Sequence, residues 1–519
     1  MSYSHTAAQP SAMGSNPVAT PMPRIASART LMRLATLTAQ NAKIIVVSNR
    51  EPVVHEHAAT GIKTNRPTSG LVTGLEPIVR AVNGTWVAHG SGSADRQVVD
   101  HHDRVGVPQD QPEYTLRRVW LSDREERGYY NGLSNNALWP LCHIAYTRPV
   151  FSRLDWELYK SVNEKFCDAV LDEIGDGRAV VFIQDYHLAL LARMLKNIRP
   201  DLTIAQFWHI PWPNREVFRS FPWGPELLDG LLGNDILGFH LQWHCINFLE
   251  TVDSAIEAMV DYEHFRVFRG GHPTSVRPFP ISVDQSQIGS DVQTPEVAFR
   301  VNELRAQFDQ LPTMQKFIVG VDRIDYTKGI LERLHAFETL LKNHPELKSQ
   351  VTFLNFSAPS RTPVQAYRTL NDEIDGLVEE VNRRYGTESW KPVQFLRAHH
   401  DYHTVLAAYQ LADVMVVTSL HDGMNLVAKE FIAARTDGDG VLVLSSNTGA
   451  ANELGEALLV NPLDTDSLAD RMYEALIMPY EERQQRMKRL RETVGKNDIY
   501  RWGMRIFDEL HRALKAGEL

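Results

Sequence analysis

The amino-acid sequence predicts an α/β protein with two doubly wound domains that face each other across a cleft. Short apolar runs such as KIIVVSNR and DVMVVTS alternate with longer helical stretches from about residue 43 onward. These runs are apolar throughout, which is typical of parallel strands covered by helices on both faces. The length of 519 residues also exceeds the roughly 250–300 residues that one hydrophobic core supports. We therefore expect ligands at the carboxyl ends of the strands in both domains.

A polar, turn-rich segment, PISVDQSQIGSDVQTPE, separates the two series of apolar runs. The first series contains KIIVVSNR, AVVFIQ and TIAQFW, and the second contains KFIVGVDR, VTFLNFS, DVMVVTS and GVLVLSS. We expect residues 43–290 to form the first domain and residues 291–495 the second domain. The helical segment at residues 496–519 is expected to cross back to the first domain.

Residues 1–42 differ in composition from the rest of the chain. They are rich in Ser, Ala and Pro and contain no Asp or Glu. Organellar transit peptides share this composition, so that interpretation stays open. We expect a disordered extension with a short helix near ARTLMRLATL.

The composition excludes several classes of protein. The net charge of −10 argues against a nucleic-acid or membrane-surface partner, because such proteins carry a basic excess. Cys142, Cys167 and Cys245 are scattered, which favours buried thiols in a reducing compartment over a disulfide or zinc framework. No apolar run approaches the roughly 18–20 residues needed to span a bilayer. We expect a soluble, cytoplasmic protein.

Polar residues follow nearly every predicted strand. In the first domain they are Arg50, Asp185 and His209. In the second domain they include Arg323 and Lys328. Because the carboxyl ends of parallel strands meet at one edge of a sheet, we expect these side chains to gather in the cleft.

Arg323 and Lys328 lie five positions apart in the turn VDRIDYTKG. Two fixed cations at the end of a strand are suited to an anion, and a diphosphate leaving group develops negative charge in the transition state. Arg can grip two oxygens with its planar fork, while Lys supplies a compact charge. The alternative is a surface pair without a role.

The segment HDGMNLVAKE follows the strand DVMVVTS. Gly423 allows a ligand to approach the backbone, and a helix beginning near Asn425 presents unpaired N–H groups. One turn after Leu426, Glu430 can return towards the cleft and suits the hydroxyls of a ribose. Asp422 suits sugar hydroxyls. The alternative is that Asp422 caps the helix and Glu430 is a solvated charge.

Nine motifs are similar, in order and spacing, to those of the trehalose-6-phosphate synthases: VVSNREP, LWPLCH, QDYHLALL, FWHIPWP, LGFH, VDRIDYTKG, SAPSR, DGMNLVAKE and GAANEL. That family consists of retaining glucosyltransferases with the two-domain GT-B fold. The resemblance runs from about Lys43 to the C-terminal helix. It implies transfer of glucose from UDP-glucose to glucose 6-phosphate, which gives trehalose 6-phosphate.

The resemblance also implies roles for individual residues. The diphosphate would lie on Arg323 and Lys328, the ribose on Glu430, and the donor glucose on Asp422 with help from His209. His209, Arg323, Lys328 and Asp422 are the expected catalytic residues. The expected donor-binding residues are Gly70, Arg323, Lys328, Asp422, Gly423, Met424, Asn425, Leu426 and Glu430.

On the acceptor side, the resemblance implies that Arg50, Tyr130 and Arg361 bind the phosphate of glucose 6-phosphate. Guanidinium forks match phosphate oxygens, so this set makes chemical sense. Trp139 and Asp185 would shape the site of the acceptor sugar.

The family is thought to react on one face of the sugar, where the leaving phosphate takes the proton of the acceptor. The sequence shows no convincing pair of carboxylates for double displacement. We expect no cofactor and no metal, because Arg323 and Lys328 neutralise the diphosphate. The DxD-like sequences at Asp437 and Asp464 lie in polar turns and are expected to be solvated. The run HHDYH at residues 399–403 has the spacing of metal ligands, but it has no evident carboxylate partner and is not expected to bind a metal.

The sequence departs from the family pattern at four positions. Ser69 precedes Gly70 where the family usually has two adjacent glycines, and His89 stands where many members have tryptophan. His421 replaces a usual arginine, and Ser282 replaces a common glycine. These changes concern closure of the donor loop and contacts to the acceptor.

Two other functions stay open. Glucosylglycerol-phosphate synthases share the REP sequence and an altered glycine-rich loop and use glycerol 3-phosphate, although SNR and APSR in this chain favour glucose 6-phosphate. A catalytically silent sugar-phosphate sensor would lose the donor cations or Glu430, which are all present. The nucleoside of the donor and assembly into a homo-oligomer also stay open.

Overall fold

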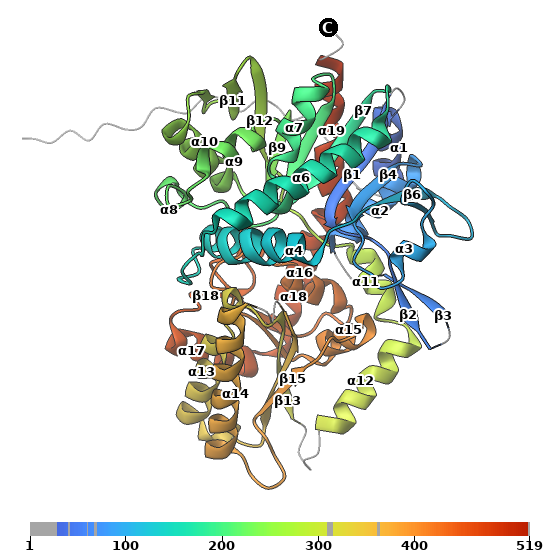
Figure 1. The fold of residues 1–519 in the computed structure, drawn as a ribbon. Helices are drawn as coiled ribbons and strands as arrows, with labels where there is room; N and C mark the ends of the chain where they lie inside the picture. Colours follow the sequence, from blue (N-terminus) through green and yellow to red (C-terminus); the bar gives the residue numbers. More distant parts are fainter. Residues whose placement is uncertain are drawn as a thin grey trace, which may run out of the picture.

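The computed structural model describes residues 28–39, 42–59, 61–66, 70–308, 315–360 and 364–516. Two lobes lie one above the other in Figure 1, and each is built on a sheet flanked by helices. The predicted α/β architecture of two doubly wound domains is confirmed.

The sheet of the first lobe has ten strands within the described residues, in the order β10-β11-β12-β9-β8-β7-β1-β4-β6-β5. The strands from β12 to β6 run parallel, and antiparallel strands close both edges. Every residue of β7 and β8 is buried, as expected for strands covered on both faces. The strands are β1 (Lys43–Arg50), β4 (Thr85–His89), β5 (Arg104–Val107), β6 (Tyr114–Val119), β7 (Ala179–Gln184), β8 (Thr203–Phe207), β9 (Ile236–Phe239), β10 (Met259–Asp261), β11 (Arg266–Arg269) and β12 (His272–Pro278).

The sheet of the second lobe is parallel throughout, in the order β15-β14-β13-β16-β17-β18. Counted along the chain, this is the doubly wound order 3-2-1-4-5-6, and the winding reverses between β13 and β16. Ligands of such sheets bind where the winding reverses, so the turns after β13 and β16 are the expected binding site. The strands are β13 (Lys316–Arg323), β14 (Val351–Ala358), β15 (Val393–Arg397), β16 (Val414–Val417), β17 (Val441–Ser445) and β18 (Leu458–Val460), and a separate antiparallel pair is formed by β2 (Val54–Ala58) and β3 (Gly61–Asn65).

Helices cover the sheets of both lobes (Figure 1). Those of the first lobe are α2 (Gly70–Ala81), α3 (Asp95–Val98), α4 (Asp123–Glu125), η1 (Glu126–Leu138), α5 (Trp139–His143), α6 (Arg153–Ile174), η2 (Tyr186–Leu188), α7 (Leu191–Ile198), α8 (Arg215–Phe218), α9 (Gly224–Leu231) and α10 (Gln242–Ala255). Between the sheets lie α11 (Gln285–Asp291) and α12 (Pro295–Phe308), and the second lobe has η3 (Tyr326–Lys328), α13 (Ile330–Asn343), η4 (Pro345–Leu347), α14 (Gln365–Tyr385), α15 (Tyr402–Leu411), α16 (Leu426–Ala434), η5 (Gly449–Asn452), α17 (Thr465–Ile477) and α18 (Tyr480–Lys496).

The last helix, α19 (Ile499–Ala516), follows α18 of the second lobe and packs against the first lobe. The ring of Trp502 lies 5.3 Å from that of Phe207 and 6.3 Å from that of Phe182. Figure 1 shows α19 in red, running through the upper lobe beside the blue helix α1. The chain therefore crosses back between the lobes at its end.

Helix α1 (Ala28–Ala39) packs on α19. Leu31 is 1% exposed, and a Cβ added at Gly503 would lie 2.8 Å from Leu31 Cδ2, so the two helices are in close contact there. This part of the predicted extension is thus a helix of the folded first lobe, while residues 1–27 lie outside the described residues.

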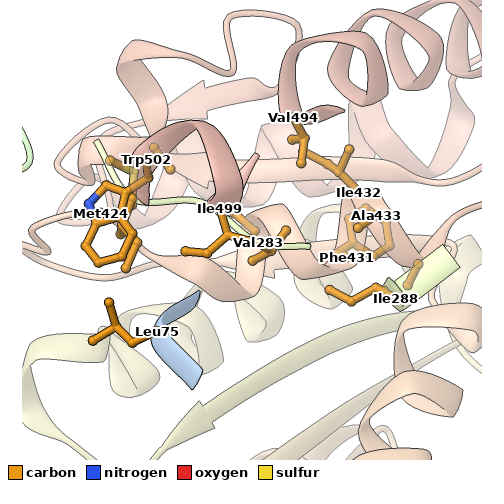
Figure 2. Packing of buried hydrophobic residues seen from close by; sticks show 14 of the residues in the cluster. Leu75, Val283, Ile288, Met424, Phe431, Ile432, Ala433, Val494, Ile499 and Trp502 are labelled. Atoms are coloured by element: carbon orange, nitrogen blue, oxygen red, sulfur yellow. The ribbon is translucent and has the colours of Figure 1, made fainter. Parts of the chain in front are cut away.

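One hydrophobic core continues across the boundary between the lobes (Figure 2). The backbone N–H of Ile499 donates to the carbonyl of Val283 (3.2 Å), and the hydroxyl of Tyr500 bonds to Asp284. Buried residues from the linking segment and from the four helices α11, α16, α18 and α19 meet here: Val283, Ile288, Phe431, Ile432, Ala433, Val494, Ile499 and Trp502. The two lobes are therefore joined by a shared, packed core at this boundary.

The cysteines and the lengths of the helices bear on two further predictions from the sequence. Cys142, Cys167 and Cys245 are buried free thiols, as predicted. Across the part of the chain that the structure describes, none of the helices has the length and apolar character required to span a bilayer.

Candidate active site

The turn after β13 carries the two predicted cations. Arg323 ends the strand, and Asp325 begins η3 by accepting the backbone N–H of Thr327 (3.0 Å). Lys328 follows, and Gly329 has a φ of 61°. A Cβ on Gly329 would lie 2.1 Å from the carbonyl oxygen of Thr418, so only glycine fits where this turn meets the end of β16.

Lys328 forms an ion pair with Asp422, which follows β16. The distance between Lys328 Nζ and Asp422 Oδ2 is 2.5 Å, and both side chains are largely buried. The hydroxyl of Ser419 and the amide of Asn425 also donate to Asp422 Oδ2, each at 3.3 Å. Burial opposes ionisation of Asp422, but the Lys328 ammonium and the hydrogen bonds outweigh it and hold the pKa below its ordinary value.

Asn425, and not Asp422, caps helix α16. Its Oδ1 accepts the backbone N–H of Ala428 (3.0 Å), and its φ of 83° turns the chain into the helix that starts at Leu426. The predicted helix start near Asn425 is confirmed. The alternative that Asp422 is the cap is wrong, since Asp422 pairs with Lys328.

Gly423 lies where the second lobe touches the first. A Cβ at this position would come within 2.8 Å of the carbonyl oxygen of His209 and 2.9 Å of the ring of His240. Next to it, Met424 is 2% exposed and its carbonyl accepts the backbone N–H of Ala450 (2.8 Å). Glycine at position 423 therefore permits the close approach of the two lobes beside Asp422.

Glu430 is half-buried on α16, one turn after Leu426. Its Oε2 accepts the hydroxyl of Tyr409 (2.8 Å), and burial raises the pKa of Glu430. The alternative that Glu430 is a solvated charge is wrong.

His209 and Asp185 face this junction from the ends of β8 and β7. Asp185, with a φ of 71°, accepts the backbone N–H of His209 on Oδ1 (3.2 Å). His209 Nε2 lies 3.0 Å from Gln184 Oε1. Burial lowers the pKa of His209 to about 3, so the imidazole is neutral near pH 7. With Nε2–H donating to the Gln184 oxygen, Nδ1 remains as an acceptor.

Arg50 and Tyr130 lie together at the edge of the first lobe. Arg50 Nη2 is 3.4 Å from the hydroxyl of Tyr130, whose ring stacks on His187 at 5.6 Å between centroids. A pocket of about 230 Å³ is lined by Arg50, Tyr130 and His89 among others. The structure thus brings two of the three predicted phosphate-binding residues together.

A buried charged cluster lies beneath Arg50. Arg118 pairs with Glu51 (Nε to Oε2, 2.8 Å) and with Asp95 (Nη2 to Oδ1, 2.7 Å), and these three side chains are at most 1% exposed. Ser91 donates its backbone N–H to Glu51 Oε1 (2.8 Å). Burial, together with the nearby carboxylate of Asp95, raises the pKa of Glu51 to about 7 against the pull of Arg118. This cluster was not predicted from the sequence.

Trp139 lies between the predicted donor-binding residues and the predicted acceptor-binding residues. Its ring lies 5.7 Å from the guanidinium carbon of Arg323, and its Nε1–H donates to Asp325 Oδ1 (3.4 Å). Trp139 belongs to the first lobe and the other two residues to the second. The indole therefore joins the predicted acceptor side to the predicted donor side.

A second contact between the lobes lies next to Asp422. His421 Nδ1 donates to the carbonyl of His143 (2.8 Å), and a pocket of about 340 Å³ beside them is lined by His143, His244, His421 and Asp422 among others. Burial lowers the pKa of His143 and of His244 to about 3. The departure at His421 therefore places a neutral ring, and not a permanent cation, at this contact.

Three of the residues named from the sequence lie at or beyond the ends of described segments. Arg361 lies outside the described residues, and so does Ser69, while Gly70 is the first residue of α2. Asp325 and its contact with Trp139 were not predicted from the sequence. The Asp-x-Thr spacing in VDRIDYTKG is a signal for a capping turn and could have revealed the first of these roles.

Within the described ranges, no group of three or more His, Cys, Asp or Glu side chains is arranged to hold a metal ion. In the run HHDYH, His400 bonds to the carbonyl of Leu396 (3.0 Å) and Asp401 caps α15. These two side chains thus have structural partners.

Comparisons with known proteins agree with the motif resemblance. A model of the family described as glycosyltransferase family 20 matches residues 42–512. The trehalose-6-phosphate synthase of Mycobacterium avium (strain 104) is 39% identical over 478 residues, which cover 91% of this chain and 95% of that protein. The corresponding protein of Mycobacterium tuberculosis (strain H37Rv) is 38% identical over 486 residues, with 92% and 96% covered.

Solved structures show the same two-lobed arrangement. A trehalose-6-phosphate protein from E. coli, bound with UDP-2-fluoro glucose, is 30% identical with a TM-score of 0.81, covering 91% of this chain and 99% of its own. An alpha,alpha-trehalose-phosphate synthase (UDP-forming) from Burkholderia xenovorans in complex with glucose-6-phosphate is 29% identical with a TM-score of 0.79, covering 90% and 100%. The fold is thus the predicted GT-B fold, and the chain belongs to glycosyltransferase family 20.

Proposed function

We propose that this protein is a retaining glucosyltransferase that transfers glucose from UDP-glucose to glucose 6-phosphate and releases trehalose 6-phosphate and UDP. The observation that carries the proposal is the pairing of Lys328 with Asp422 where the winding of the second sheet reverses. Arg323 ends the strand before the same turn and lies against the ring of Trp139. Arg50 and Tyr130 lie together on the first lobe. The relatives and solved structures of the same family support this reading.

On the donor side, Arg323 and Lys328 bind the diphosphate of UDP-glucose. As the diphosphate enters, it competes with Asp422 for the Lys328 ammonium, and the released carboxylate accepts a hydroxyl of the donor glucose. The backbone of residues 423–425 lines the sugar. Gly70 at the start of α2 and Leu426 at the start of α16 border the site, and Glu430 binds the ribose hydroxyls.

On the acceptor side, Arg50, Tyr130 and Arg361 bind the phosphate of glucose 6-phosphate, because guanidinium forks match phosphate oxygens. Trp139 and Asp185 enclose the acceptor sugar. His209 is neutral near pH 7, so it offers a hydrogen-bond acceptor to the donor glucose without adding charge.

The reaction forms a bond between the anomeric carbon of the donor glucose and the anomeric oxygen of the acceptor. The bond from that carbon to the diphosphate oxygen breaks on the same face of the sugar. The leaving diphosphate oxygen takes the proton of the acceptor hydroxyl. Arg323 and Lys328 stabilise the negative charge that develops there, so the proposal requires neither a metal nor a cofactor.

The test is a matrix of donors and acceptors. UDP-, GDP- and ADP-glucose are each combined with glucose 6-phosphate, glycerol 3-phosphate and glucose, and release of nucleoside diphosphate is measured together with identification of the product. Release with glucose 6-phosphate and formation of trehalose 6-phosphate support the proposal. Faster turnover with glycerol 3-phosphate would show a glucosylglycerol-phosphate synthase, and tight sugar-phosphate binding without any release would show a sensor.

We also propose a cytoplasmic location. The net charge of −10 and the absence of a membrane-spanning helix among the described residues are consistent with it. Fractionation of cells that express the chain from its own promoter tests the proposal.

A further inference from the structure

Asp325 is a buried carboxylate that is contacted from both lobes. The residue is 0% exposed. Oδ1 accepts the indole N–H of Trp139 from the first lobe (3.4 Å) and the backbone N–H and hydroxyl of Thr327 (3.0 and 2.9 Å). Oδ2 accepts the hydroxyl of Tyr367, which lies in the second lobe (2.9 Å). Hydrogen-bond donors from both lobes thus converge on one carboxylate.

The same residue fixes the turn that carries Lys328. Besides its side-chain bonds to Thr327, the carbonyl of Asp325 accepts the backbone N–H of Lys328 (3.0 Å). The other end of the turn is held by Thr418, whose hydroxyl donates to the carbonyls of Lys328 and Gly329 (3.1 and 2.9 Å). A change in the orientation of the Asp325 carboxylate therefore shifts the backbone from which the Lys328 side chain extends.

Trp139 connects this turn to the opposite side of the cleft. One face of its indole lies near the guanidinium of Arg323, and its N–H bonds to Asp325. Helix α5 also receives the bond from His421, the neighbour of Asp422. This short helix of the first lobe thus contacts the segments after both β13 and β16, which flank the point where the winding of the second sheet reverses.

We propose that Asp325 is a positioning residue that couples occupation of the acceptor site at Trp139 to the diphosphate clamp of Arg323 and Lys328. The inference rests on the proposed function. An acceptor that fixes the indole of Trp139 strengthens its bond to Asp325, and the carboxylate then holds the turn of Lys328 in the orientation that binds the diphosphate. Coupling of this kind is reciprocal, so the acceptor tightens nucleotide binding by the same factor by which the nucleotide tightens acceptor binding.

The experiment measures the dissociation constant of UDP for the full-length chain by calorimetry, without and with glucose 6-phosphate at a concentration that saturates each variant. In the unsubstituted protein, glucose 6-phosphate tightens UDP binding by about five-fold or more, the lower end of typical couplings. Asp325→Asn keeps the shape of the side chain and removes its charge, and Trp139→Phe keeps a ring and removes the N–H donor. Both variants lose the tightening. A change in the binding of UDP alone cancels in the ratio of the dissociation constants measured with and without glucose 6-phosphate.

Tyr367→Phe is the matched control. It removes a donor to the other oxygen of the same carboxylate, from within the second lobe, and it retains the tightening. A role that is merely structural would affect Tyr367→Phe and Asp325→Asn alike. The ratio of the two UDP dissociation constants is therefore the decisive readout.

Three outcomes overturn the inference. The first is that glucose 6-phosphate still tightens UDP binding in both Asp325→Asn and Trp139→Phe. If Asp325→Asn fails to fold, tightening that persists in Trp139→Phe is sufficient to overturn the inference. Independent binding of UDP and glucose 6-phosphate to the unsubstituted protein also overturns the inference. The proposed function would not be affected by that result, because it is tested by product formation in the turnover assay. Failure of the unsubstituted protein to bind either ligand overturns the inference together with the proposed function.

Discussion

The ammonium nitrogen of Lys328 lies 2.5 Å from the carboxylate oxygen Oδ2 of Asp422. The two residues come from turns after different strands, β13 and β16, so the pair bridges the place where the winding of the sheet reverses. Removing one partner from such a buried pair leaves an uncompensated charge. The pair thus holds the lysine in place and keeps Asp422 ionised.

Replacing Lys328 with alanine should lower kcat by about 10²–10³-fold, because the ammonium acts on charge that develops at the leaving group. Binding of glucose 6-phosphate, measured by calorimetry, should change little. The control is Lys342→Ala, which removes an exposed lysine from α13. An unchanged kcat in Lys328→Ala would remove this residue from the reaction.

Replacing Arg50 with alanine should raise the KM for glucose 6-phosphate by about ten-fold or more, because a charge-assisted bond to phosphate is lost. The rate with unphosphorylated glucose should stay the same within error. Tyr130→Phe, which removes the hydroxyl 3.4 Å from Arg50 Nη2, should produce a smaller effect of the same kind. Equal losses with both acceptors would exclude Arg50 from phosphate binding.

Replacing Gly423 with alanine should separate the lobes beside the active site. The added Cβ would meet the carbonyl oxygen of His209 at 2.8 Å, and a displacement of about 1 Å can cost about 10²-fold in kcat/KM. Steady-state kinetics measures the loss, and circular dichroism checks that the fold is retained. Gly455→Ala is the control, because no atom lies within 4 Å of the Cβ it would add. Similar kinetics for both variants would contradict the argument.

The stability of the protein should depend on pH through Glu51. Its pKa is raised from 4.5 to about 7 in the folded state, so the folded protein binds a proton more tightly than the unfolded chain. This stabilisation is fully present below about pH 4.5 and is lost as the pH rises through 7. The loss in the free energy of unfolding over this pH range is at most about 3 kcal/mol. In urea titrations at pH 5 and pH 8, Glu51→Gln should gain stability relative to the unsubstituted protein at the higher pH. A difference that is the same at both pH values would show that Glu51 does not titrate in this range.

Replacing Leu31 with alanine should destabilise the first lobe by about 2–5 kcal/mol, since the side chain is buried against α19. Urea unfolding measures the change. Leu37→Ala is the control on the same helix, because Leu37 is 51% exposed, and it should change the free energy of unfolding by less than about 0.5 kcal/mol. Equal stability of Leu31→Ala and the unsubstituted protein would show that α1 adds nothing to the folded lobe.

The sequence was sufficient for the architecture and for most of the cleft. Apolar runs such as β7 and β13 identify parallel strands, and parallel strands necessarily bring their carboxyl ends together. This is why Lys328 and Asp422, 94 positions apart in the sequence, could be predicted to meet. Their approach follows from the geometry of the sheet and needs no knowledge of side-chain packing.

Contacts that depend on how the lobes dock were not predictable. Trp139 and Asp325 are 186 residues apart and lie in different lobes. No local sequence pattern determines how the two lobes are oriented relative to each other. The pair of Glu51 and Arg118 was missed for a related reason. Both residues look like ordinary surface charges in the sequence, and only the packing of β1 against its neighbours buries them.

The α1 helix shows the same limit at the chain ends. Its amphipathic pattern predicts a helix, yet its partner is α19, at the far end of the sequence. Residues 1–42 are rich in Ser, Ala and Pro, which indicated disorder. Composition carries no information about a packing partner at the other end of the chain. Long-range packing thus changed the interpretation of a segment whose local structure was predicted correctly.

The return of α19 to the first lobe also sets an order on biosynthesis. Phe182 and Phe207 leave the ribosome about 300 residues before Trp502, which takes roughly 15–60 s at usual elongation rates. During that interval the nascent amino-terminal half lacks the aromatic rings that complete its interior. Each lobe also has a core cluster of its own, drawn from residues 45–276 in the first lobe and from residues 318–478 in the second. Each lobe can therefore begin to consolidate as it is translated, whereas the part of the first lobe's core that packs on Trp502 is completed only after the final helix has emerged.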